Sequence, residues 1–132
     1  MDRDSGVIAG TKFRTWLRPD GVVHLTWASQ VEIGLEDAIE AIQAMTELTG
    51  GRRTPLLVDP RGNRAVARSA RRELAGCDSL ASAVALIVGS PLSRMMGEFF
   101  LTVNKPRFPM RLFGDEGSAV TWLETFVVDH GA

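Results

Sequence analysis

Short apolar runs alternate with amphipathic helical segments along this chain, and this alternation restricts the fold more than any other feature. The run Leu56-Leu57-Val58 is apolar at every position and too short for a helix. It lacks polar alternation, which is typical of a strand covered on both faces of a sheet. Residues 83–88 form a second run of this kind. Strands separated by helices predict an α/β fold with right-handed crossovers and a mainly parallel sheet.

The N-terminal part predicts an antiparallel hairpin. Residues 13–17 and 22–27 are rich in β-forming side chains, and Pro19-Asp20-Gly21 between them supplies turn chemistry. Residues 1–10 are polar and contain glycine, so we expect a flexible start. The remaining residues, 11–132, are expected to form a single domain.

Four helices are predicted after the hairpin. The first spans 35–49 and stops at Gly50-Gly51, and the second spans 65–76 and exposes arginines. The third begins after Ser90 with proline at its first position and ends near Asn104. Its stripe is expected to be buried and comprises Leu92, Met95, Met96, Phe99, Phe100 and Val103.

A short strand over residues 110–113 and a fourth helix capped by Asp115 complete the predicted elements. In this helix Ala119, Trp122, Leu123 and Phe126 are expected to be buried. The predicted order is β-β-α-β-α-β-α-β-α, with five strands and about four helices in one mixed, mainly parallel sheet.

Several phrases resemble the STAS and SpoIIAA-like fold, which bacterial anti-sigma-factor antagonists share with cytoplasmic domains of sulfate transporters. The likeness covers roughly residues 11–128. Besides the hairpin, its carriers are Pro55-Leu-Leu-Val-Asp59, Val84-Ala-Leu-Ile-Val-Gly89, Pro109-Met-Arg-Leu-Phe113 and Ala119-Val-Thr-Trp-Leu123. The last two are most similar to SpoIIAA-like proteins of unknown function. The resemblance implies a bacterial regulatory or protein-interaction module.

The sequence departs from these antagonists at their phosphorylation site. The antagonists switch partners through a Ser or Thr in an Asp-Ser-x-Gly-like phrase after the Asp-containing strand. Here the chain has Asp59-Pro-Arg-Gly-Asn-Arg-Ala-Val-Ala67, and the nearest hydroxyl is Ser69. We interpret Ser69 as an N-cap rather than a phosphate acceptor, so a module without a phosphorylation switch is expected.

Charge is segregated along the chain although the net charge is −1. Residues 1–51 hold 4 basic and 8 acidic side chains, residues 52–111 hold 11 and 4, and residues 112–132 hold none and 4. The basic middle is either an anion-binding face or an ordinary solvated surface. Nucleic-acid binding is not expected, because aromatic side chains are not interleaved with the basic ones.

Other functional classes lack their sequence signatures. No apolar run approaches the roughly 20 residues that span a bilayer, and the N-terminus lacks a signal-peptide core, so a cytoplasmic protein without stable membrane insertion is expected. Cys77 is the single cysteine, and with two histidines no metal set is spaced for zinc. Neither a phosphate-binding glycine motif nor a nucleophile–histidine pair occurs. We therefore expect no cofactor, metal or catalytic residue.

The candidate binding site lies in the loops at the carboxyl ends of the strands, where open α/β sheets bind ligands. These loops are 59–64, 89–90 and 114–115. Trp16 is a further candidate, because an aromatic side chain between Arg14 and Arg18 suits an exposed interface. The candidate ligand- or partner-binding residues are Asp59, Arg61, Asn63, Arg64, Arg68, Ser90 and Trp16.

Two functions remain open at this point, and an enzyme that brings Asp59, Asn63 and Ser90 together in a strand-end cleft comes third. The first is an interaction module that binds a protein partner, or a second copy as a homodimer, through the strand-end loops and the arginine-bearing helix. The second is a carrier of a small anionic or lipid-like ligand, held between Met96 and Phe100 on one side and Arg61 or Arg64 on the other.

Overall fold

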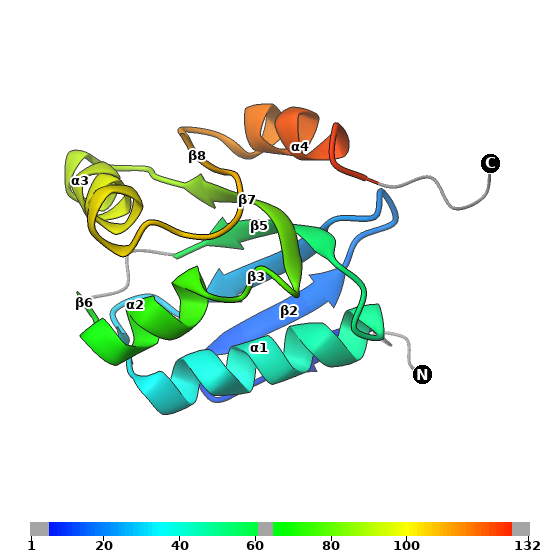
Figure 1. The fold of residues 1–132 in the computed structure, drawn as a ribbon, viewed down its shortest axis with the longest axis horizontal. Coiled ribbons are helices and arrows are strands. Elements are labelled where there is room, and N and C mark those ends of the chain that lie inside the picture. Colours follow the sequence, from blue (N-terminus) through cyan, green and yellow to red (C-terminus); the bar gives the residue numbers. More distant parts are fainter. Residues whose placement is uncertain (1–5, 61–64, 128–132) are drawn as a thin grey trace.

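A six-stranded sheet forms the centre of the computed structural model, which describes residues 6–60 and 65–127 (Figure 1). The strand order is β1-β2-β3-β5-β7-β8. The first three strands pair antiparallel, and β3, β5, β7 and β8 run parallel. Their bounds are β1 Val7–Ala9, β2 Phe13–Leu17, β3 Val23–Trp27, β5 Thr54–Asp59, β7 Ala81–Ile87 and β8 Met110–Phe113. Two further strands, β4 (Glu32–Ile33) and β6 (Ala65–Val66), form a separate parallel pair.

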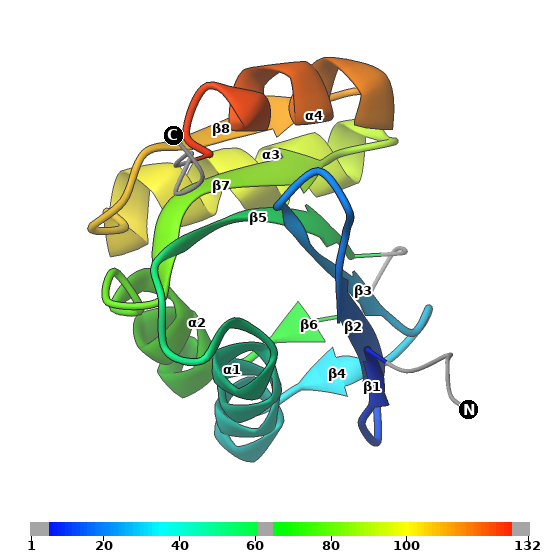
Figure 2. The same ribbon diagram turned by 90° about the vertical axis from the view of Figure 1, so that its right-hand side faces the viewer.

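The helices are α1 Leu35–Thr49, α2 Arg68–Ala75, α3 Pro91–Phe99 and α4 Glu116–Glu124. A five-residue π-helix, η1 (Phe100–Asn104), continues α3 directly. Helices α1 and α2 lie on one face of the sheet and α4 on the other, as Figure 2 shows. Helix α3 packs through Gly97 against Leu86 and Leu112. Because side chains alternate along a strand, Leu86 shares the sheet face of Val84, which is also the face that α1 and α2 cover.

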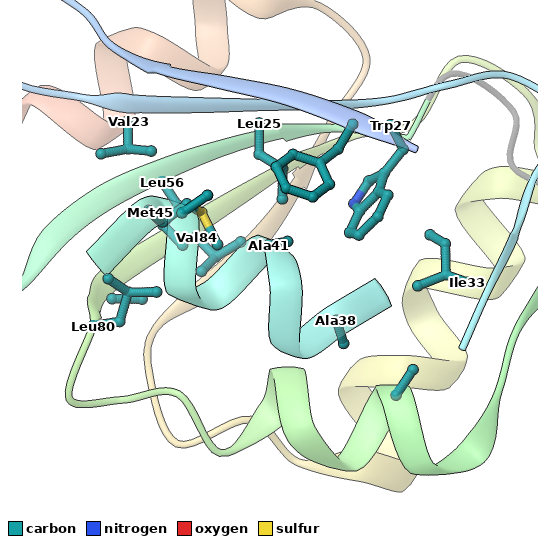
Figure 3. Packing of buried hydrophobic residues seen from close by; sticks show 14 of the residues in the cluster. Val23, Leu25, Trp27, Ile33, Ala38, Ala41, Met45, Leu56, Leu80 and Val84 are labelled. Carbon is teal, nitrogen blue, oxygen red and sulfur yellow. The ribbon is translucent and has the colours of Figure 1, made fainter. Parts of the chain in front are cut away.

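The larger core lies between α1 and the sheet (Figure 3). Leu25 and Trp27 from β3 and Leu56 from β5 point toward Ala41 and Met45 of α1. The Trp27 ring also meets the Phe13 ring edge to face, with centroids 5.6 Å apart. Small alanines on α1 allow the helix to approach the sheet closely.

The smaller core lies beneath α4. Leu57 of β5 and Ala85 of β7 pack against Ala119 and Leu123 of α4, and all four are fully buried. Consecutive β5 residues, Leu56 and Leu57, therefore enter different cores. This is the physical reason that the strand lacks polar alternation.

The predicted α/β class with a mainly parallel sheet and four helices is confirmed, but the number of strands is corrected. Val7–Ala9, expected to be flexible, form the edge strand β1, with Val7 opposite Trp16. The short pair of β4 and β6 was not predicted either. Segments of two or three residues are too short to show a period, and only the partner strand stabilises them.

Helix α2 begins three residues later than the sequence predicts. Ala65 and Val66 pair with β4, and the N-cap position of α2 is Ala67, which offers no side-chain hydrogen bond. The interpretation of Ser69 as the N-cap is therefore wrong, and this residue lies exposed in the first turn. Pairing with β4 keeps Ala65 and Val66 extended, so the helix begins at Arg68.

The predicted caps of α3 and α4 are confirmed. Ser90 Oγ accepts a hydrogen bond from the Ser93 amide at 3.1 Å, and Asp115 Oδ1 accepts one from the Ser118 amide at 2.8 Å. The amide and hydroxyl of Ser118 hold the pKa of Asp115 below its ordinary value. Ala119 and Leu123 of α4 are buried as predicted, whereas Trp122 is half-buried and Phe126, also half-buried, lies beyond the end of the helix.

The Asp37 carboxyl, near the N-terminus of α1, is expected to contribute to stability in a pH-dependent way. Burial raises the pKa of Asp37, but hydrogen bonds from Lys12 Nζ (2.9 Å) and the Gly34 amide (2.8 Å), together with the Lys12 charge, lower it overall. A carboxyl whose pKa is lower in the folded state stabilises the fold above its unfolded pKa, about 3.9 for Asp. This contribution disappears as the pH falls through the folded-state pKa.

We expect Asp37→Asn to unfold at lower urea concentration than the wild type at pH 7, with the difference closing below about pH 4. Urea titrations at several pH values measure this. Glu124→Gln changes an exposed carboxylate in the same way and serves as the control. A difference that stays constant across this range would show that the ionised carboxylate is not the stabilising group.

Candidate functional site

The strand-end loops bring only part of the predicted site together. Asp59 ends β5 opposite Thr26 of β3 and is half-buried. Arg61, Asn63 and Arg64 lie outside the described residues. The Ser90 hydroxyl is engaged with Ser93 in the cap of α3. Of these strand-end residues, the structure thus describes the carboxyl of Asp59 and Ser90, which caps α3.

Trp16 does not lie on a surface shared with Arg68. It is half-buried on the sheet face opposite Phe13, where its ring stacks on His24 with centroids 4.3 Å apart. Arg68 is exposed on α2, which covers the other face of the sheet. The two candidate residues therefore belong to separate surfaces on opposite faces of the sheet.

A shallow, open depression of about 470 Å³ lies at the end of the β2–β3 strand pair that is far from its turn. It is lined by residues 9–14 and 26–29. Its Lys12 ammonium is already bonded to Asp37 and to the Glu32 carbonyl oxygen at 2.7 Å. The Lys12 ammonium thus already has two partners within the protein. The predicted carrier site beside Met96 and Phe100 involves different residues from this depression.

An apolar row of side chains on α3 and η1 faces solvent, although the sequence predicts that it is buried. The exposed fractions are 62% for Leu92, 60% for Met95, 47% for Phe99 and 55% for Val103. We call these four residues the apolar stripe. They follow one another at intervals of three, four and four residues, so they lie along one face of the helix.

Gly97 explains why the apolar stripe is exposed. It is the one buried residue of α3, and a Cβ added there would lie 2.9 Å from Leu112 Cδ2 and 3.2 Å from Leu86 Cδ2. The helix therefore rests on the sheet through its glycine, with Met96 and Phe100 half-buried at one side. This rotation turns the apolar stripe outward.

One arginine of α2, Arg71, contacts the apolar stripe, and two more lie on the same face of that helix. Arg68, Arg71 and Arg72 are spaced i, i+3 and i+4 and share one face of the helix. The Arg71 guanidinium lies over the Phe99 ring, 5.2 Å from its centroid. Its Nε donates to Asn104 Oδ1 at 3.2 Å and its Nη1 donates to the Val66 carbonyl at 2.7 Å. These contacts join the arginine face to the apolar stripe, and we call the combination the α2–α3 surface.

The charge of this surface is not neutralised within the described ranges. The ion pairs found there are Lys12–Asp37, Arg18–Asp20 and Arg18–Glu116, none of which involves α2 or α3. Arg68 and Arg72 are exposed, and Arg71 is half-buried with neutral partners. Among the residues that the structure describes, the α2–α3 surface is thus an exposed apolar row beside arginines that form no ion pair.

Sequence reasoning identified Arg68 and the four residues of the apolar stripe, but predicted wrongly that the stripe is buried. One signal was present: the apolar side chains of residues 92–103 cover a wider arc than the roughly 100° stripe of a single contact face. Such a helix has an apolar face left over after packing on the sheet. Which face remains depends on Gly97.

Some site types are not found in the described residues. There, no group of three or more His, Cys, Asp and Glu side chains is placed to bind a metal ion. No helix within that part is both long and apolar enough to cross a bilayer. Burial raises the pKa of the Cys77 thiol to about 11.

Structural comparison defines the class of this protein as SpoIIAA-like in fold. An uncharacterised protein of the DUF3478 family from Shewanella loihica PV-4, described as having a SpoIIAA-like fold, superposes with a TM-score of 0.57. The two chains are 15% identical over 89% of this chain and 90% of the other. The predicted resemblance is confirmed at the level of the fold.

The chain belongs to the family described as a domain of unknown function, DUF7793, whose model matches residues 15–127. It is also similar to a protein with unknown function from Arthrobacter sp. FB24, with 33% identity over 83% of this chain and 96% of the other and a TM-score of 0.33. A search of the curated proteins finds no match.

Proposed function

We propose that this protein is a regulatory or protein-interaction module that binds a partner protein through the α2–α3 surface. The observation that carries this proposal is the exposure of the apolar stripe, whose members are 47–62% exposed. Together they present on the order of 400 Å² of apolar area, in the range where patches on monomers are often functional. Covering this area with a partner removes it from water.

The shape of the surface favours a macromolecule over a small ligand. Small-molecule sites are concave and enclose most of the ligand. The apolar stripe instead lies on the outward face of a helix, next to the arginines of α2. A flat or helical partner can cover such a row, whereas a carrier function would need a cavity beside Met96 and Phe100.

A photo-crosslinking amino acid at position 95 tests the proposal in native host cells that express the full chain. We expect a discrete protein adduct from Met95 and none from Thr121, an exposed position on α4 at the opposite face of the sheet. Introducing Leu92→Glu and Val103→Glu into the Met95 reporter should remove the adduct, because two carboxylates would enter the apolar contact.

The urea unfolding curve of that variant provides the folding control, because both substituted side chains are exposed. Adducts of equal yield from positions 95 and 121, or an adduct that persists in the folded double variant, would rule out the α2–α3 surface as the contact.

A further inference from the structure

We infer that the segment that docks on the α2–α3 surface is an acidic amphipathic helix of the partner protein. This inference rests on the proposed function and names the chemistry of its partner. It follows from three properties of the surface: the spacing of the apolar stripe, the arginines of α2 that form no ion pair with any described residue, and the fixed placement of Arg71.

The spacing of the apolar stripe suits a helix. Its members occur at intervals of three, four and four residues from Leu92 to Val103. At the rise of an α-helix this row is about 16 Å long, or three turns of an α-helix laid along it. Apolar rows of this periodicity pack against the i, i+3, i+4, i+7 face of a second helix.

The charges beside the stripe specify an acidic partner. Arg68 and Arg72 are exposed on the face of α2 that also carries Arg71, and no carboxylate pairs with them in the part of the chain that the structure describes. Glutamates or aspartates along one flank of the docked helix would reach these guanidinium groups. Such pairs select the partner and set its orientation.

Arg71 is held in position before any partner binds. Hydrogen bonds to Asn104 and to the Val66 carbonyl fix its guanidinium over Phe99. A planar guanidinium with fixed orientation loses little freedom when it meets a carboxylate. A partner can therefore place an apolar side chain on the apolar stripe and a neighbouring carboxylate against the fixed guanidinium of Arg71.

The same charges argue against two other occupants. A second copy docked face to face would bring two sets of the same arginines together, and like charges at an interface are unfavourable. On α3 an anionic bilayer would meet Glu98 as well as Arg94, so this helix presents no net charge to anionic lipids, and α2 carries Glu73 beside its arginines. A partner helix avoids both conflicts, because it can carry carboxylates on one flank and a cation opposite Glu98.

The test uses the full chain and a synthetic fluorescent peptide of about 18 residues, long enough to form helix in isolation. The peptide has leucine and phenylalanine at i, i+3, i+4 and i+7 and glutamate along one flank. One control peptide has lysine at every glutamate position, and another has the same composition in scrambled order. Fluorescence anisotropy measures the dissociation constants at low and at physiological salt.

We expect the acidic peptide to bind at least about tenfold more tightly than either control peptide, with an affinity that falls as salt rises. Met95→Glu should weaken binding about tenfold or more, and so should Arg68→Glu combined with Arg72→Glu. Arg14→Glu changes an exposed arginine on the other face of the sheet and should leave binding unchanged. Unfolding curves confirm that each variant is folded.

Equal binding of the acidic and lysine peptides, or binding of neither, would overturn the inference. So would a wild-type dimer in sedimentation that Met95→Glu dissociates, or Met95-dependent binding to vesicles of phosphatidylglycerol and phosphatidylcholine. The crosslinking experiment keeps the two conclusions separate. A Met95-specific protein adduct without preference for the acidic peptide retains the proposed function and rejects the acidic helix, and absence of that adduct rejects the function itself.

Discussion

Trp27→Ala is expected to lower the free energy of unfolding by about 3–5 kcal/mol, the usual cost of truncating a buried large aromatic side chain. Trp27 is 3% exposed and ends β3, where its ring contacts Phe13 and lies in the core beneath α1. The surrounding strands and helix prevent collapse around so large a cavity. Urea titration followed by circular dichroism measures the loss.

Trp16→Ala is the matched control for this substitution. Trp16 is half-buried and stacks on His24 outside both cores. Its truncation removes one ring contact and opens no enclosed cavity, so we expect a clearly smaller loss of stability. Equal losses for the two variants would mean that the core beneath α1 is not the main source of stability.

Leu57→Ala and Leu92→Ala are expected to differ strongly although they make the same chemical change. Leu57 is fully buried in β5 against α4, and its truncation should cost about 2–5 kcal/mol. Leu92 is 62% exposed, and its truncation should change stability by no more than about 0.5 kcal/mol. Both values come from urea unfolding under identical conditions.

This comparison also tests the α2–α3 surface itself. If Leu92→Ala destabilised the protein as much as Leu57→Ala, the apolar stripe would be core, and no docking surface would exist there. The expected pattern is a stable Leu92→Ala protein that has lost affinity for its partner. Stability would then depend on the buried apolar side chains, and binding on the exposed apolar stripe.

Much of the fold could be predicted because its elements carry strong local signals. Helix α1 begins at Leu35 and ends before Gly50, as the apolar spacing and the paired glycines predict. The strand β8 has its predicted bounds, and the caps at Ser90 and Asp115 are confirmed. These features depend on residues close in sequence.

Two classes of feature could not be predicted. The edge strand Val7–Ala9 and the two-residue strands β4 and β6 form only because a partner strand lies beside them. The orientation of α3 depends on Gly97 meeting Leu86 and Leu112, which come from two other strands. Nothing in the neighbouring sequence contains this information.

The candidate site divides in the same way. The sequence by itself determined the residue chemistry: arginines at helical spacing in α2, and more apolar side chains in α3 than one contact face can bury. Tertiary structure alone decided that Leu92 and Met95 face solvent and that Arg71 meets Phe99. The physical reason is that periodicity defines which residues share a helix face, whereas the rotation of the helix is decided by close packing against residues distant in the chain.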